Sequence, residues 1–159
     1  MPATSDTHYF REEHCLPVLN GTNKEEVITE LIQCFVASGA VTEQGALDLT
    51  VEVLGREEEA TTGIGKGVAM PHARASTVIG GTLVAVGVHH EGVDFDSLDG
   101  APVHVVFLIA ASDSQEYLRV AGRIARVGRD EVEVKALPRQ PSAKAMLAFL
   151  EESWTTAAR

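Results

Sequence analysis

The clearest candidate for chemistry in this chain is one histidine, together with the glycine-rich segment before it. That segment reads Thr62-Gly63-Ile64-Gly65-Lys66-Gly67-Val68-Ala69-Met70-Pro71-His72-Ala73-Arg74. Pro71 fixes its own φ near about −65°, so it stiffens the chain directly before His72. An imidazole with a pKa near ~6.5 is substantially neutral at pH 7, and one nitrogen of the neutral ring keeps a lone pair for attack. The segment therefore predicts a nucleophilic imidazole held in one orientation.

The glycines of this segment have two interpretations. Backbone N–H groups of Gly63, Gly65 and Gly67 can contribute to an anion-binding nest, or these residues can simply form a turn. A nucleotide loop is a weak match, because a Walker A motif needs Ser or Thr after Gly-Lys and Lys66 is followed by Gly67. A dinucleotide fingerprint would need a third glycine where the chain has Val68. The segment favours anion binding or a turn over a nucleotide site.

Length and composition indicate one folded domain. The chain has 159 residues, of which 45% are hydrophobic, and this is enough for one sizeable core. We expect a single domain over residues 1–159, with an irregular N-terminal extension over residues 1–14. The formal net charge of −10 argues against nucleic acid as a partner, because phosphate backbones select basic surfaces.

No segment of the sequence is typical of a secreted or membrane protein. The N-terminus has neither the basic start nor the apolar stretch of a secretory signal. No apolar run approaches the ~20 residues that span a bilayer. Cys15 and Cys34 do not form a metal-like pair; one bridge between them is possible, but a reduced setting is the simpler interpretation. We therefore expect a cytoplasmic protein without direct membrane insertion.

The order of expected elements indicates an α/β fold. Apolar runs at 68–70, 82–88 and 103–109 predict strands, the last two covered on both faces. Helical periodicity predicts helices that begin after Asn23, near Thr42, after Ser112 or Asp113, and near Ser142. The buried face of the second helix is expected to hold Leu47, Val51 and Leu54, and that of the third Leu118, Ala121, Ile124 and Ala125. Helix pairs against a small mixed sheet make an α/β class.

Three stretches of the chain resemble a known protein family. They are Arg56-Glu57-Glu58, the Thr-Gly-Ile-Gly…Pro-His motif that ends at His72, and the segment from Gly92 to Leu108. They closely resemble type 2 enzyme IIA domains of the bacterial phosphotransferase system, the fructose, mannitol and nitrogen-regulatory (PtsN-like) branch. The similarity covers roughly residues 15–130. It implies a three-layer α/β/α sandwich with a small mixed β-sheet.

The resemblance also implies a phosphotransferase-type phosphohistidine carrier. His72 would accept a phosphoryl group from an HPr-type phosphocarrier protein. It would then pass the group to an enzyme IIB or use it to switch binding to regulated target proteins. Arg56 matches an arginine of the family that precedes the active histidine, and it would clamp the phosphoryl oxygens. Since phosphoryl transfer depends mainly on positioning and charge neutralisation, no metal and no other cofactor is expected.

Two further residues are candidates for auxiliary roles. Arg74 is equally consistent with a solvated charge and with a contact to phosphate or to a partner. The family commonly has a second histidine at the start of the helix after the last core strand, where this chain has Tyr117. A phenol can donate a hydrogen bond but cannot act as an imidazole acid or base near pH 7, and Tyr117 also fits core packing. The alternative to a carrier is therefore a non-catalytic regulatory domain with a degenerate site, or, more remotely, a domain of an anion transporter.

Overall fold

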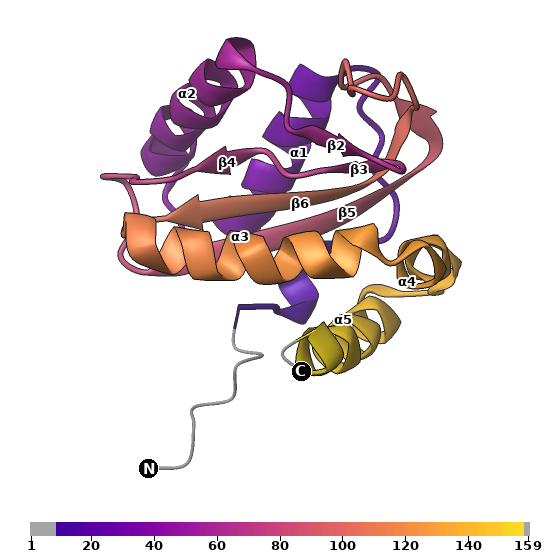
Figure 1. Ribbon diagram of the computed structural model, residues 1–159. Helices are drawn as coiled ribbons and strands as arrows, with labels where there is room; N and C mark the ends of the chain where they lie inside the picture. The colour runs from indigo at the N-terminus through magenta and orange to yellow at the C-terminus, as the bar shows by residue number, and fades with distance from the viewer. Residues whose placement is uncertain (1–8, 158–159) are drawn as a thin grey trace.

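The computed structural model describes residues 9–157 and consists of a β-sheet between two layers of helices (Figure 1). The helices are α1 (Lys24–Ala37), α2 (Glu43–Glu59), α3 (Ser114–Arg129), α4 (Glu131–Ala136) and α5 (Ala143–Ala157), with 3-10 turns η1 (Glu12–His14) and η2 (Leu137–Arg139). The strands are β1 (Cys15–Leu16), β2 (Gly63–Gly65), β3 (Val68–Ala69), β4 (His72–Ala73), β5 (Thr82–Val93) and β6 (Val103–Ala111). In this part of the chain the strands form one six-stranded sheet of order β1-β5-β6-β3-β2, with β4 also paired to β6.

The long strands β5 and β6 form the centre of this mixed sheet. They pair antiparallel from Thr82↔Ala111 to Val88↔Val105, while β1 runs parallel to β5, and β3 and β4 run parallel to β6. Successive side chains point to opposite faces, so Phe107 packs in one apolar cluster and its neighbours in the chain in the other. Burial on both faces explains why these strands are almost uninterrupted apolar runs.

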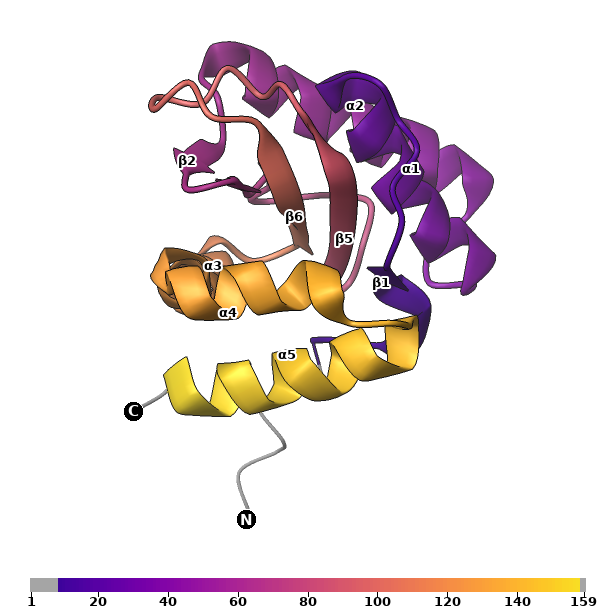
Figure 2. The same ribbon diagram turned by 90° about the vertical axis from the view of Figure 1, so that its right-hand side faces the viewer.

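Helices cover both faces of the sheet. Viewed from the side, α1 and α2 lie on one face, and α3 and α5 lie on the other (Figure 2). The first helix matches its prediction, because the Asn23 side chain accepts a hydrogen bond from the N–H of Glu26 and caps α1. The apolar face of α1 is buried, with Val27, Ile28, Leu31, Ile32 and Phe35 among its buried residues. The prediction of a three-layer α/β/α fold is confirmed.

The predicted buried face of α2 is wrong at Leu47 and Val51, whereas Leu54 is partly buried and packs against the core. Leu47 and Val51 are 62% and 73% exposed, whereas Ala46, Leu49 and Val53 are buried. Both sets recur at helical spacing, so α2 carries two apolar stripes, and only the stripe that faces the core is covered. Periodicity defines a stripe but does not identify which of two stripes meets the sheet.

The predicted N-cap of α3 is correct, but the predicted buried face of this helix is partly wrong. Asp113 caps the helix through a hydrogen bond from the N–H of Gln115. Leu118, expected in the core, is 54% exposed, and Tyr117 is buried instead. Leu118 therefore lies at the edge of the α3 face that packs on the sheet.

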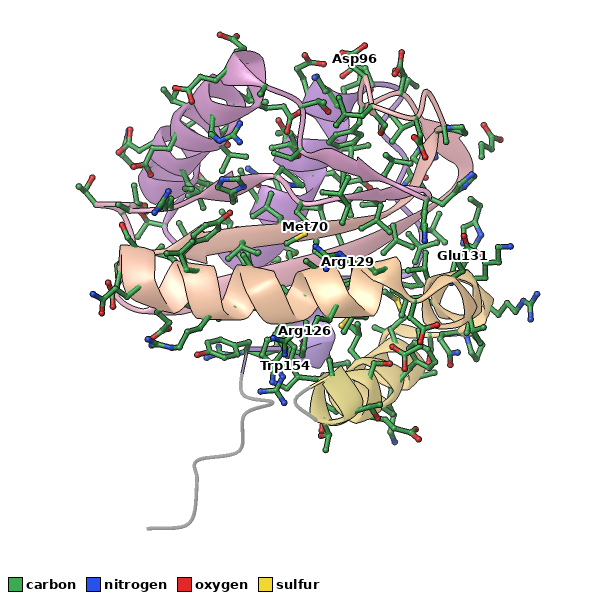
Figure 3. The ribbon with its side chains drawn as sticks, viewed as in Figure 1. Met70, Asp96, Arg126, Arg129, Glu131 and Trp154 are labelled. Atoms are coloured by element: carbon green, nitrogen blue, oxygen red, sulfur yellow. The ribbon has the colours of Figure 1, made fainter. Side chains whose placement is uncertain are left out.

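The two ends of the described chain meet beneath α3. The Phe10 and Trp154 rings pack edge to face with centroids 5.3 Å apart, and Figure 3 shows Trp154 between α3 and α5. Phe10 thus belongs to the core although it falls in the expected N-terminal extension, whose residues 1–8 lie outside the described residues. Cys15 and Cys34 are both free and buried. None of the helices within residues 9–157 has the length and hydropathy needed to cross a bilayer.

Candidate active site at His72

The backbone of His72 is fixed by the central strand β6. The strands β3 and β4 both pair with β6, with Ala69 opposite Val106 and His72 opposite Ile109. Pro71 has no N–H to donate and separates the two short strands, while its carbonyl accepts a hydrogen bond from the N–H of Ile109 at 3.0 Å. The histidine therefore sits on a rigid part of the sheet rather than on a free loop.

The imidazole of His72 is held in one tautomer. Its Nδ1 lies 2.9 Å from the carbonyl oxygen of Met70. A carbonyl can only accept, so Nδ1 carries the hydrogen and donates it. The proton-free nitrogen is then Nε2, whose lone pair remains for attack. The ring is therefore held in one orientation, as the sequence predicted.

The surroundings of His72 keep the ring neutral. Burial lowers its pKa below the usual value, and the nearby positive charges of Arg56 and Arg74 lower it further. The Met70 carbonyl and the Glu57 carboxylate act in the opposite direction, but burial is the largest effect. Because the pKa of His72 lies below 6.5, the unprotonated form of the ring dominates at pH 7.

His72 lies in a cavity of about 490 Å³ where α2, β4 and the first turn of α3 meet. The lining residues are Glu52, Arg56, Glu59, His72, Ala73, Arg74, Ala75, Tyr117 and Leu118. The guanidinium of Arg56 is anchored through Nη1, which donates to the Ala60 carbonyl at 2.9 Å. A guanidinium has five N–H donors, so this anchor leaves others to bind an anion. The structure thus brings Arg56, Arg74 and Tyr117 to His72.

Tyr117 packs directly on the imidazole. The two ring centroids are 4.7 Å apart with an interplanar angle of 31°, and the Arg74 guanidinium carbon lies 5.9 Å from the tyrosine centroid. Burial raises the pKa of Tyr117, against the opposing effect of Arg56 and Arg74, so the phenol stays protonated. Tyr117 is both a core residue and a wall of the cavity.

The three glycines of the segment do not line this cavity. The N–H of Gly63 donates to Thr61 Oγ1 at 3.0 Å. Gly65 and Gly67 shape the turn between β2 and β3, where both adopt positive φ values of 95° and 82°. Gly67 lines a separate cavity at the far end of β3. Of the two interpretations of the glycines, the structure supports the turn.

A buried carboxylate, Glu57, connects α2 to the glycine segment, although the sequence assigned it no role beyond the family resemblance. Glu57 is 4% exposed and accepts hydrogen bonds from the N–H and hydroxyl of Thr62. Its other contact is an ion pair with Lys24 at 3.5 Å. Because Arg56 precedes Glu57, this anchor also positions the arginine. The available signal was a charged residue four positions after Val53, on the buried stripe of α2.

The comparisons with known proteins agree with this geometry. The family described as phosphoenolpyruvate-dependent sugar phosphotransferase system, EIIA 2, matches residues 8–153. A nitrogen regulatory protein of Bradyrhizobium diazoefficiens is 32% identical over 156 residues, which cover 96% of this chain and 98% of that protein. The fructose-specific EIIABC component of Bacillus subtilis is 39% identical over 95 residues, 60% of this chain but only 14% of that larger protein.

Solved structures show the same fold. The nitrogen regulatory protein IIA-Ntr of Neisseria meningitidis aligns with a TM-score of 0.80 at 23% identity, covering 91% of this chain and 97% of that one. Mannitol enzyme IIA of Escherichia coli, solved in complex with phosphorylated enzyme IIB, aligns with a TM-score of 0.74 at 22% identity, covering 90% and 97%. With the family match over most of its length, the chain belongs to the type 2 EIIA family of the phosphoenolpyruvate-dependent sugar phosphotransferase system.

Proposed function

We propose that this EIIA protein carries its phosphoryl group on Nε2 of His72. The supporting observation is the hydrogen bond from Nδ1 to the Met70 carbonyl, which leaves Nε2 as the nucleophile. The Nε2 lone pair attacks the phosphorus of a phosphohistidine donor. A new N–P bond forms, and the donor nitrogen leaves with the electron pair of the broken bond. A neutral His72 needs no separate base for this attack.

Arg56 and Arg74 are the groups that would neutralise the transferred charge. Both line the cavity with His72, and guanidinium groups bind phosphoryl oxygens through paired N–H donors. Tyr117 would hold the imidazole plane through their ring contact. The three glycines act in this proposal on the turn between β2 and β3, not on the phosphoryl group.

The donor and acceptor in this proposal are proteins. An HPr-type phosphocarrier would supply the group, and an enzyme IIB or a regulated target would respond to it. Leu118, an exposed leucine on the cavity rim, suits contact with a protein surface. The Escherichia coli mannitol enzyme, which shares the fold, was solved with its phosphorylated IIB partner.

The decisive experiment is phosphorylation in a purified system. The protein is incubated with labelled phosphoenolpyruvate, enzyme I and an HPr-type carrier, and acid-labile label is counted. We expect label on the wild type and none on His72→Gln. The exposed His90 provides a matched control, since His90→Gln should be labelled normally. Label that persists in His72→Gln would refute the assignment.

Tyr117 supports a second candidate, a regulator that is phosphorylated but transfers the group poorly. Its phenol stands beside His72 and stays protonated near neutral pH, so it offers neither acid nor base for onward transfer. Phosphorylated protein is mixed with fructose-type and mannitol-type enzyme IIB, and loss of label is followed. Slow loss that accelerates in Tyr117→His would favour the regulator, whereas rapid transfer from the wild type would favour the transport role.

A further inference from the structure

A second cavity lies at the opposite end of α3 from His72. Two adjoining lobes of about 290 Å³ each are bounded by the β2–β3 turn, the start of β6, and the α4–η2 segment. Figure 1 shows α3 running from the end of the sheet that carries β4 toward α4, and Figure 3 places Glu131 at the junction of α3 and α4. The lobes share Lys66, Gly67, His104, Val134 and Lys135.

This cavity gathers positive charge on an acidic protein. Lys66, Lys135 and Arg139 line the two lobes, and Glu131 is the carboxylate residue among the lining residues. The Lys66 ammonium lies 3.7 Å from Glu131, so this carboxylate offsets one of the three cations. The whole chain has a formal net charge of −10. A concave cationic site on such a background selects an anion.

His104 lines both lobes of the cavity, and a backbone contact fixes its ring. Its Nδ1 lies 2.9 Å from the carbonyl oxygen of His89, so Nδ1 donates to that oxygen and Nε2 is the ring nitrogen left to accept. A Cβ at position 92 would come within 2.9 Å of Cε1 and 3.1 Å of Nε2. Gly92 therefore leaves open the space that the ring occupies. An acceptor beside several cations suits a ligand that combines a negative group with an N–H or O–H donor.

Lys66 lines this cavity from a turn in which its backbone is left-handed. Lys66 has a φ of 58°, a left-handed conformation that a residue with a Cβ rarely adopts. Its N–H donates to Asp99 Oδ2 at 2.9 Å, which holds the turn in place. Strained residues of this kind often mark functional positions.

We propose that this cavity binds a small organic anion, phosphorylated or carboxylated, that also carries a hydroxyl or amine donor. Lys66, Lys135 and Arg139 would bind the anionic group, and His104 Nε2 would accept the donor. The buried Val134 side chain provides an apolar wall. Ligand sites typically begin near ~300 Å³, so lobes of this size fit a small metabolite. The site is separate from the cavity around His72.

The test is an NMR titration of the uniformly ¹⁵N-labelled full chain. The probes are glycerol 3-phosphate and malate, which share the required chemistry but differ in the anionic group, with neutral glycerol as control. We expect saturable shifts of the Gly67, Val134 and Lys135 amides with at least one anionic probe and none with glycerol. Linear shifts without saturation, or shifts confined to residues around Arg56 and Arg74, would overturn the proposal.

Variants at the rim separate binding from general charge effects. Lys135→Ala removes an exposed cation, and Lys66→Gly removes a side chain while suiting the positive φ. Each should weaken probe binding about tenfold, the effect of one lost charged contact. Lys144→Ala, an equal charge change at an exposed position of α5, should leave the affinity within about twofold. Equal weakening by Lys144→Ala and Lys135→Ala would overturn a specific site.

His72→Gln should bind the probes normally, so the outcome of this binding test does not depend on phosphorylation.

Discussion

The cavities at the two ends of α3 differ in charge and burial, and this difference suits them to the different tasks proposed for them. Around His72 the central group is buried and its pKa is lowered, and the lining contains two arginines and two glutamates. Around His104 the lining has three cations and one carboxylate, and the cations are exposed. A transferred phosphoryl group must arrive and leave, so a balanced site avoids holding it too tightly. A site that retains a small anion benefits instead from excess positive charge.

The largest effect should come from Arg56. Replacing it with Gln removes the guanidinium beside His72 while keeping a polar side chain, and we expect the initial rate of phosphoryl incorporation to fall by about 10²–10³. Arg56→Lys keeps the charge but loses the paired donors, so its rate should lie in between. Lys135→Ala, in the other cavity, should be phosphorylated at the wild-type rate. A normal rate in Arg56→Gln would remove the arginine from the proposed chemistry.

Tyr117 should be the next most sensitive position. Tyr117→Ala removes a buried ring and should destabilise the fold by roughly 3 kcal/mol, measured by urea unfolding. It also admits water to His72, and because burial is the main cause of the lowered pKa of that histidine, its pKa should rise. Tyr117→Phe keeps the ring contact and should keep the pKa low. NMR titration of the His72 ring distinguishes the two variants; a pKa that rises equally in both would assign the effect to the hydroxyl.

A smaller effect should appear in the pH dependence of stability. Burial lowers the pKa of His72 and of His14, so the unfolded chain binds these protons more readily than the folded chain. The contribution of these two histidines to the free energy of unfolding should therefore be fully present above about pH 6.5. It should decrease as the pH drops toward their folded pKa values. The limiting slope is about 1.4 kcal/mol per pH unit for each histidine. His72→Gln should show a shallower loss between pH 7.5 and 5.5 in urea unfolding. The same slope in both proteins would contradict a lowered pKa at His72.

The sequence was most informative where neighbouring residues determine the outcome. The Asn23 cap, the two central strands and the orientation of His72 after Pro71 depend on local chemistry or on continuous apolar runs. The buried stripe of α2 was predicted wrongly, because Leu47 and Leu49 both belong to apolar stripes at helical spacing. Only packing against α1 and the sheet selects between these stripes.

The second cavity could not be predicted from local sequence, because it too depends on tertiary packing. It joins Lys66 and His104 to Lys135, and these residues meet only because the short α4 folds back at the end of α3. Six residues of helix carry little periodicity, and proline at position 138 masked the pattern further. Glycine signals were equally ambiguous, since a turn and an anion nest need the same residues.

The smallest predicted effect is that of substitutions in the glycine turn, and it tests which of the two cavities this turn serves. Gly67 has a φ of 82°, and a Cβ there would only touch the Pro102 carbonyl at 3.6 Å and the His104 ring at 3.8 Å. Gly67→Ala should therefore cost about 1–2 kcal/mol of stability from backbone strain alone. Gly122→Ala, in an exposed position of α3 with open space around it, should instead stabilise by up to about 1 kcal/mol.

Phosphorylation assays on Gly67→Ala and Gly122→Ala then show whether the two cavities act independently. If the glycine turn serves only the Lys66 side, Gly67→Ala should accept phosphoryl groups at the wild-type rate while its binding of glycerol 3-phosphate or malate weakens. Gly122→Ala should be normal in both assays. A loss of phosphoryl acceptance in Gly67→Ala comparable to that of Arg56→Gln would mean that strain at the turn reaches His72 through β3. The two ends of the sheet would then be one coupled site, and an anion bound beside Lys66 would alter the reactivity of His72.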